Sequence, residues 1–287
     1  MKSWAHICKE NFDDDVAALL PRDLTPIFDR TGVDEPQEFA TFILNKILSS
    51  SDPNPKSLKL PRFTRDIGNL VRANFEISRQ NITKLRRKIV SQLNGEEKDT
   101  HLSTFVVSYA YIIVSIVKAK QLEKKGKVGF LFSGDCRSRL NPPLPTNYFG
   151  NCVIGSFVLI DTETIAEGDL IVWVVKELSR MIKELEIRVK NMSSDREIEN
   201  LLNFERNIVK VADLIIGVAG SPQFGIYGTD FGWGKPNKIQ IVSIDNRGAI
   251  SMAESRDGNG GIEVGLVLKK HEMEMFSSLF VNGFKDM

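Results

Sequence analysis

Apolar side chains recur with two different periods along this chain, and the period predicts the type of element. Residues 69–77 alternate between apolar and polar positions, as a half-buried strand does. Ile82, Leu85 and Ile89 instead recur at the spacing of one helix face, so a helix is expected there. The same reasoning predicts further strands at 128–133, 153–160, 214–219, 239–244, 249–253 and 262–268, and further helices at 102–120, 168–188 and 271–284.

The order of these elements predicts the fold class. Strands interleaved with helices indicate α/β layers around a mixed sheet rather than a helix bundle or a β-sandwich. Residues 245–248 separate the expected strands at 239–244 and 249–253, which is the spacing of a β-hairpin.

The first sixty residues have a different character. Trp4, Ile7 and Cys8 follow the i, i+3, i+4 spacing of a short helix, and no capping residue precedes them, so we expect the chain to begin inside an element. Six prolines then divide residues 20–61 into short pieces around one helical stretch near 36–48. This composition is typical of an extended connection between domains.

Composition narrows the class of protein and its partners. A content of 42% hydrophobic and 26% charged residues is that of an ordinary globular chain. The formal net charge of +1 provides no field that would draw the chain to nucleic acid or to an acidic membrane. The apolar run at 105–117 is interrupted by Ser and Tyr and is shorter than the ~20 residues of a membrane helix, so we expect a buried helix.

Three cysteines, Cys8, Cys136 and Cys152, are an odd number without CxxC spacing, which argues against a disulfide framework and a zinc site. No metal site is expected. The first residues lack the apolar core of a secretory signal and the character of a transit peptide, so the cytosol is the expected compartment.

The most distinctive segment is YGTDFGWGKP at 227–236. Gly232 and Gly234 permit a positive φ, Trp233 offers a large side chain as a buried anchor, and Asp230 requires a cationic or N–H partner. Because no second acid or base lies nearby in sequence, both a structural turn and a catalytic carboxylate remain open for this segment.

Five segments together carry a resemblance to a known family. They are LSTFVVSYAY at 102–111, GDCRSRLNPPLP at 134–145, NYFGNCV at 147–153, DFGWG at 230–234 and DGNGGIEVG at 257–265. In this order they resemble the BAHD acyl-CoA-dependent acyltransferases, and specifically the clade that acylates anthocyanins and other phenolic glycosides, often from malonyl-CoA.

The resemblance implies a fold and a domain division. It implies a two-domain α/β fold like that of chloramphenicol acetyltransferase, with mixed sheets and with most of the N-terminal domain missing. Residues 1–20 are then a remnant of that domain, 21–61 the crossover, and 62–287 the C-terminal domain, with 231–255 packing on the N-terminal domain.

The family's general base, the His of an HxxxD motif, has no counterpart here. His6, His101 and His271 are followed four residues later by Glu, Phe and Met. The resemblance places the motif just before a helix similar to residues 2–9, so we expect this chain to be truncated and inactive by itself. It also implies that Asp230, with Phe231, Gly232, Trp233 and Gly234, shapes the channel by pairing with an Arg.

Acyl-CoA is the co-substrate that the resemblance implies, and binding its phosphates requires cations, hydroxyls or helix-start N–H groups. Each candidate also has a structural interpretation. The hydroxyl residues could be helix caps, Lys98 a solvated lysine, Arg137 an ion-pair partner of Asp135, and Asn151 a turn residue. The candidates for acyl-CoA binding are Lys98, Ser103, Thr104, Arg137, Arg139 and Asn151.

The expected function is transfer of a malonyl or hydroxycinnamoyl group from CoA to a hydroxyl of a phenolic or flavonoid glycoside. The alternative is a non-catalytic remnant that binds CoA. Expected partners are these small molecules, without nucleic acid or membrane, and a complete protein is expected to be monomeric. The basic run KLRRK at 84–88 lacks interleaved aromatics and is expected to be a solvated helix face.

Overall fold

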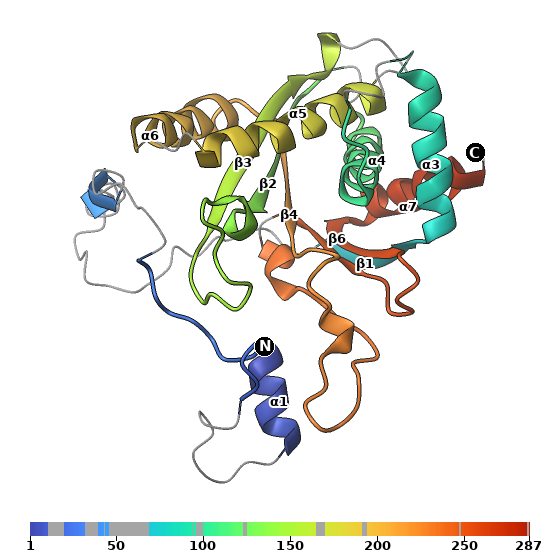
Figure 1. Ribbon diagram of the computed structural model, residues 1–287. Coiled ribbons are helices and arrows are strands. Elements are labelled where there is room, and N and C mark those ends of the chain that lie inside the picture. The colour runs from blue at the N-terminus through green and yellow to red at the C-terminus, as the bar shows by residue number, and fades with distance from the viewer. Residues whose placement is uncertain are drawn as a thin grey trace.

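The fold is built on a six-stranded mixed sheet, and most of its helices pack on one side of it (Figure 1). The computed structural model describes residues 1–10, 20–31, 40–42, 44–45, 69–93, 95, 100–122, 125–164, 170–190, 194–246, 248–285 and 287. Its strands are β1 (Leu70–Ile77), β2 (Lys127–Asp135), β3 (Val153–Asp161), β4 (Leu214–Ala219), β5 (Ile250–Glu254) and β6 (Ile262–Lys269). Its helices are α1 (Lys2–Glu10), α3 (Arg79–Gln92), α4 (Thr104–Ala119), α5 (Leu170–Lys190), α6 (Ser194–Asn203) and α7 (Lys270–Lys285).

The strand order is β1-β6-β5-β4-β2-β3. β4 pairs in parallel with both β2 and β5, whereas the pairs β1–β6, β5–β6 and β2–β3 are antiparallel. The expected mixed sheet is therefore confirmed.

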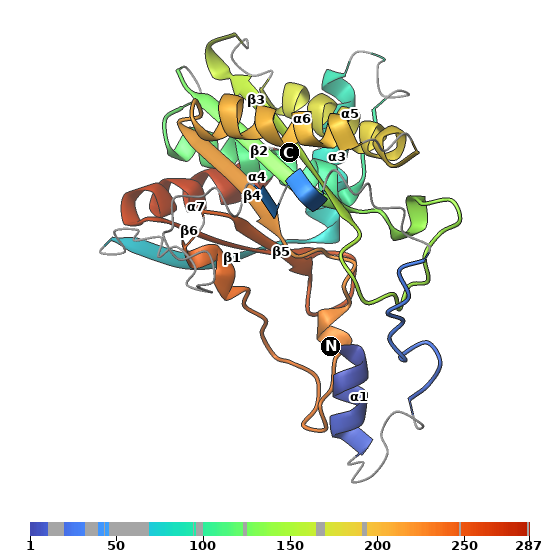
Figure 2. The same cartoon turned by 90° about the vertical axis from the view of Figure 1, so that its left-hand side faces the viewer.

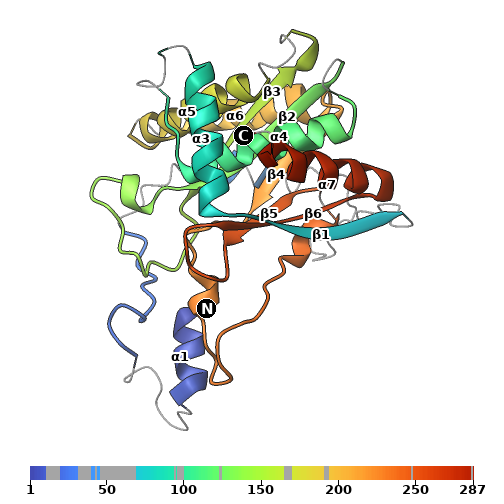
Figure 3. The same ribbon diagram turned by 90° about the vertical axis from the view of Figure 1, so that its right-hand side faces the viewer.

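The core lies between the sheet and α4, because α4 is apolar around its whole circumference. Every residue from Val106 to Val117 is buried, and α3, α5 and α7 pack around this helix. Figure 3 shows the four helices together above β1, β5 and β6. Inside this core the Tyr109 hydroxyl lies 2.9 Å from the carbonyl oxygens of Leu131 in β2 and Ile216 in β4.

The opposite side of the sheet carries α1 and the segment around 223–246, which project away from the helices (Figures 1 and 2). The expected strand at 239–244 is wrong, because residues 242–246 form a 3₁₀ turn and β5 pairs with β4 and β6 instead. Arg72 of β1 donates through Nε to Asp245 Oδ1 at 2.9 Å, and Ile244 is fully buried next to Gly265. These contacts hold the segment against the sheet face rather than beside a strand.

The sequence analysis also missed α6 and the π-helical turn Phe204–Val209 that follows it. The Ser-x-x-Glu spacing of 194–197 is a capping-box pattern that could have indicated this helix. Arg188 of α5 pairs with Glu197 of α6 and so holds the second helix near the end of the first.

Candidate functional site

The DFGWG segment lies in a loop whose first residues are hydrogen-bonded to β5 and β6. The loop begins with the 3₁₀ turn Ile226–Gly228. The backbone N–H of Tyr227 donates to Glu254 Oε1 at 2.9 Å, and its hydroxyl donates to Glu263 Oε2 at 2.7 Å. Burial, reinforced by the Glu263 carboxylate, raises the pKa of Tyr227 to about 12. A protonated, buried tyrosine therefore holds the start of the loop in place.

Asp230 holds the turn itself together. Its Oδ1 accepts the backbone N–H groups of Gly232 and Gly234, both at 2.9 Å, and its Oδ2 lies 3.1 Å from Nζ of Lys9 in α1. Both glycines adopt the positive φ that glycine permits, +103° and +93°. The N–H of Gly232, followed by Lys9, holds the pKa of the Asp230 carboxyl below its usual value. These contacts are those of a carboxylate that organises a turn.

Two expectations for this loop are wrong. The cation paired with Asp230 is Lys9, not an Arg, because α1 packs directly against the loop. Trp233 is not a buried anchor, since 93% of its surface is exposed. The chain reverses through positive φ on both sides of Trp233, which leaves that side chain in solvent. Phe231 makes the aromatic contact instead, edge to face with Trp4 at 5.2 Å between ring centroids.

A second group of candidates surrounds the 3₁₀ turn Arg137–Arg139, just after β2. Arg137 pairs with Asp135 at 3.0 Å, and its guanidinium also donates to the carbonyls of Gly150 at 3.0 Å and Tyr148 at 3.4 Å. The ion-pair interpretation of Arg137 is thus the one that the structure shows.

Arg139 donates through Nη1 to the backbone carbonyl of Asp135. Its Nε is buried and has no hydrogen-bond partner among the residues that the structure describes. Asn151 is exposed in the segment that leads into β3. The fold therefore brings Arg137, Arg139 and Asn151 into one loop cluster.

The third group lies at the start of α4. Ser103 is the N-cap, and its Oγ accepts the Val106 N–H at 3.2 Å, while Thr104 is the first helical residue. Lys98 lies outside the described residues. The His101 N–H donates to Ser179 Oγ of α5 at 2.6 Å, which brings α5 directly beside this helix start.

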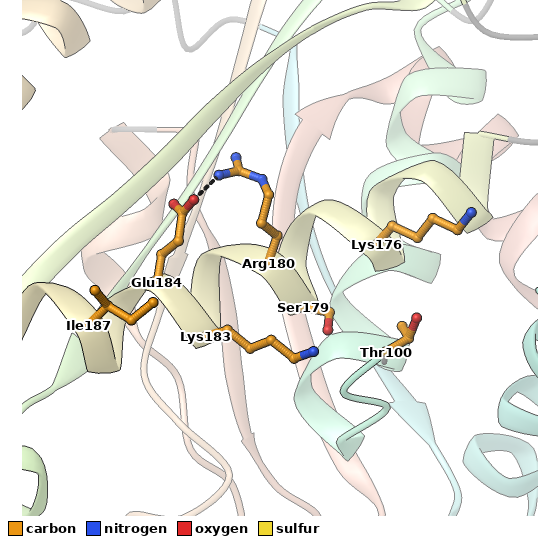
Figure 4. Close-up of a pocket in the computed structure, with 7 residues that line it drawn as sticks. All are labelled: Thr100, Lys176, Ser179, Arg180, Lys183, Glu184 and Ile187. Carbon is orange, nitrogen blue, oxygen red and sulfur yellow. Dashed lines mark hydrogen bonds and ion pairs between the residues drawn. The ribbon is translucent and has the colours of Figure 1, made fainter. Parts of the chain in front are cut away.

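A hollow of about 250 Å³ lies at this junction (Figure 4). Six of its seven lining residues come from α5, and Thr100 faces them from the segment before α4. The lining residues are Thr100, Lys176, Ser179, Arg180, Lys183, Glu184 and Ile187. Arg180 is engaged by Glu177 and Glu184, and the hydrogen bond to Glu177 is the main reason that its pKa is raised. Lys176 and Lys183 are the two other cationic residues of the lining.

α5 connects the second and third groups. Ser179 contacts the segment before α4, and about two and three turns further along, Leu185 and Val189 are buried with Cys136, Tyr148 and Cys152. The DFGWG loop, with α1, forms a separate group on the other side of the sheet (Figure 2). Sequence reasoning missed Lys9, because its contact with Asp230 joins opposite ends of the chain and leaves no local signal.

The histidines do not form a catalytic or metal-binding group. His6 lies in α1, His101 before α4 and His271 in the first turn of α7. Within the described parts of the chain, no group of three or more His, Cys, Asp or Glu side chains could hold a metal ion. None of the described helices combines the length and the apolar character needed to cross a membrane.

Comparison with known proteins identifies relatives over the whole chain. A family model described as "Transferase family" matches residues 1–282. Phenolic glucoside malonyltransferase 1 of Arabidopsis thaliana is 38% identical over 301 residues, covering 100% of this chain and 62% of that protein. Malonyl-CoA:anthocyanidin 5-O-glucoside-6''-O-malonyltransferase, also of A. thaliana, is 39% identical over 293 residues, covering 99% of this chain and 62% of that protein. The chain therefore spans about three fifths of the length of these relatives.

Solved structures show the same fold. Vinorine synthase superimposes with a TM-score of 0.56 at 22% identity, over 74% of this chain and 48% of the enzyme. TRI101 of F. sporotrichioides superimposes with a TM-score of 0.54 at 15% identity, over 73% and 49% of the two chains. The expected chloramphenicol-acetyltransferase-like fold is thus confirmed. Since the family model and these relatives align with nearly the whole length of the chain, this chain belongs to the BAHD family of transferases.

Proposed function

We propose that this chain is the CoA-binding part of an acyltransferase that moves a malonyl or hydroxycinnamoyl group from CoA to a hydroxyl of a phenolic or flavonoid glycoside. The observation that carries this proposal is the identity of 38–39% with two malonyltransferases over essentially the whole chain. The division into a remnant at 1–20, a crossover at 21–61 and a C-terminal domain at 62–287 is part of the proposal. The contact of Phe231 with Trp4 supports packing of 231–255 on the first of these parts.

The reaction is a direct transfer. A general base takes the proton of the acceptor hydroxyl while its oxygen attacks the thioester carbonyl, and the tetrahedral oxyanion then collapses with release of the CoA thiolate, which is protonated to CoA. None of His6, His101 and His271 stands in an HxxxD motif. We therefore propose that the base belongs to the two fifths of the relatives' length that this chain does not span.

The phosphate-bearing end of acyl-CoA is proposed to bind at the start of α4. Ser103 and Thr104 lie at this helix start, where N–H groups and a positive dipole end favour anions, and Lys98 precedes them in the sequence. The adjacent hollow adds Lys176 and Lys183. Phosphate groups would there meet cations as well as N–H donors.

The acyl end is proposed to meet the cluster of Arg137, Arg139 and Asn151. Arg139 is the stronger candidate for a malonyl carboxylate, because Arg137 is already used by Asp135 and two carbonyls. The buried Nε of Arg139 supports this choice. Asp230 and the DFGWG loop are proposed to have a structural role.

Acyl-CoA serves as a co-substrate, and we propose no metal, nucleic acid or membrane partner. The complete protein is proposed to be a cytosolic monomer. The alternative, a CoA-binding protein without turnover, is favoured by one observation only, the absence of HxxxD from these residues.

CoA release from malonyl-CoA in the presence of a flavonoid glucoside tests the proposal. We expect no appreciable turnover by this chain alone, because general-base catalysis typically supplies about 10²- to 10⁴-fold. Fused to the segment of phenolic glucoside malonyltransferase 1 that it does not match, the chain should turn over, and ~10 s⁻¹ is a typical turnover number for an enzyme. The matched control is the same fusion with the histidine of its HxxxD motif changed to Ala.

An inactive but folded fusion that still binds malonyl-CoA would support the alternative. Lys176→Met and Lys183→Met should then weaken malonyl-CoA binding in both the chain and the fusion. Turnover near ~10 s⁻¹ by the chain alone would refute the proposal that its base lies elsewhere.

A further inference from the structure

Within the segment at 147–150, three of the four residues are needed for the packing of the loop, whereas the side chain of the fourth is mostly exposed. Asn147 donates through Nδ2 to the carbonyls of Arg22 at 3.1 Å and Thr25 at 2.6 Å. Tyr148 is buried in the cluster beneath the loop. Gly150 is needed because a Cβ there would lie 2.5 Å from the Tyr148 hydroxyl oxygen.

Phe149 is the exception. It is 70% exposed, although an apolar ring of this size is usually buried. Its backbone N–H donates to the Ile27 carbonyl at 2.7 Å, and the Ile27 N–H donates to the Asn147 carbonyl at 3.0 Å. Two segments far apart in sequence are thereby held side by side (Figure 2).

Phe28 completes the arrangement from the other segment. It is 66% exposed, and its ring meets that of Phe149 edge to face at 5.5 Å between centroids. The backbone hydrogen bonds of Ile27 and the side-chain hydrogen bonds of Asn147 hold together the two segments that carry these rings. The two exposed rings form an apolar surface that the fold already holds in place. Ordering these side chains therefore costs little conformational entropy when a ligand binds.

We infer that Phe28 and Phe149 bind the aromatic ring of the phenolic glycoside acceptor. This inference rests on the proposed function, since the two malonyltransferases that the chain resembles are named for phenolic and anthocyanidin glucosides. A flat phenolic ring fits an edge-to-face pair, because aromatic rings favour offset or T-shaped contacts.

The cation that supports the Phe149 loop is already engaged, which favours this occupant over the adenine of CoA. A nucleotide brings several negative charges that need cationic partners. The guanidinium that supports the Phe149 loop belongs to Arg137, and it is already bound by Asp135, Tyr148 and Gly150. An uncharged glycoside makes no such demand.

Saturation-transfer NMR with this chain tests the inference, using 1-naphthyl β-D-glucoside as probe and methyl β-D-glucoside as the matched ligand without a ring. We expect binding only of the naphthyl glucoside, weakened about tenfold by Phe149→Ala and by Phe28→Ala. Phe149→Tyr, which keeps the ring, should bind as the unchanged chain does. Phe224→Ala, which removes another exposed ring, should have no effect.

Four outcomes would overturn the inference. The first is equal binding of both glucosides or of neither, and the second is equal weakening by Phe224→Ala. The third is that CoA by itself displaces the naphthyl glucoside and that its binding is weakened by the same two substitutions, Phe149→Ala and Phe28→Ala. The fourth is a concentration-dependent dimer that Phe149→Ala abolishes. If Phe149→Ala does not fold, Phe149→Leu keeps the bulk without the aromatic ring and decides the matter. Malonyl-CoA binding, measured separately, reports on the proposed function, so the two can fail independently.

Discussion

Asp230 Oδ2 lies 3.1 Å from Nζ of Lys9, so the DFGWG loop and α1 are joined by an ion pair between residues that are far apart in the sequence. The same carboxylate accepts two backbone N–H groups of its own loop. One side chain thus forms the turn and attaches it to α1. Since both partners are partly exposed, we expect a local effect on the loop rather than on the global stability.

Asp230→Ala should free the amides of Gly232 and Gly234. Hydrogen exchange at these two amides should become roughly tenfold faster, as loss of one ordinary hydrogen bond allows. Asp230→Asn should have a smaller effect, because an amide oxygen can still accept both N–H groups while the attraction to Lys9 is lost. Asp257→Ala is the matched control, since Asp257 organises a similar turn with Asn259 elsewhere. Unchanged exchange in Asp230→Ala would show that the turn does not depend on this carboxylate.

The attachment of the loop should respond to acid in a defined direction. The pKa of Asp230 is held below its ordinary value of 3.8. The bonds it makes are therefore fully present above that pH and are lost as the pH falls through the lowered pKa. We expect the protection of the Gly232 and Gly234 amides, measured as the exchange rate relative to the intrinsic rate at each pH, to fall only in this acid range, and a loss of protection already at neutral pH would contradict the assignment.

Gly234→Ala should destabilise the loop through its backbone alone. An added Cβ would meet no described atom within 4 Å, but the φ of +93° is one that L-residues avoid. We expect a cost of roughly 1–2 kcal/mol, visible as faster tryptic cleavage after Lys238, because trypsin does not cut the bond between Lys235 and Pro236. Gly228→Ala is the control, because the surrounding space is equally open and φ is not positive. Equal cleavage of the two variants would count against the strain.

Glu272→Gln should lower the free energy of unfolding by about 1–3 kcal/mol at neutral pH. Glu272 is buried and pairs with Lys120 at 2.8 Å. Burial alone would raise its pKa, but the hydrogen bonds from Lys120 and the Lys269 N–H outweigh it and place the pKa below the ordinary 4.5. The stabilisation is thus complete above pH 4.5 and is lost as the pH falls through the lower folded pKa.

Denaturant unfolding of Glu272→Gln across this range provides the measurement. The difference from the unchanged chain should shrink below pH 4.5, whereas Glu274→Gln, at an exposed position on the same helix, should show little difference at any pH. A difference that grows in acid would have the wrong sign for this pair.

Tyr109→Phe should destabilise the core without changing its shape. The hydroxyl lies 2.9 Å from two strand carbonyls, and burial raises its pKa, so it remains a donor. Its removal leaves buried carbonyl oxygens short of a donor, at a cost of about 1–3 kcal/mol in the free energy of unfolding. Equal stability of the variant would mean that these carbonyls need no donor.

Much of the fold could be predicted from the sequence, because the period of apolar residues is a local property. The spacing of Ile82, Leu85 and Ile89 fixes which face of α3 is buried, and α3 begins one residue after the N-cap Ser78. The apolar run before Lys118 similarly determined a buried helix, α4. The positive φ of Gly232 and Gly234 was also predictable, since glycine is the residue that adopts it readily.

What the sequence alone determined is therefore most of the elements, the family and the two glycines of the turn. Only the tertiary structure decided that residues 239–244 lie on a sheet face, that Lys9 pairs with Asp230, that Trp233 is in solvent, and that Phe28 meets Phe149. The physical reason is the same in each case. Periodicity reports which side of an element is apolar, whereas contacts between distant segments depend on where the chain places both of them.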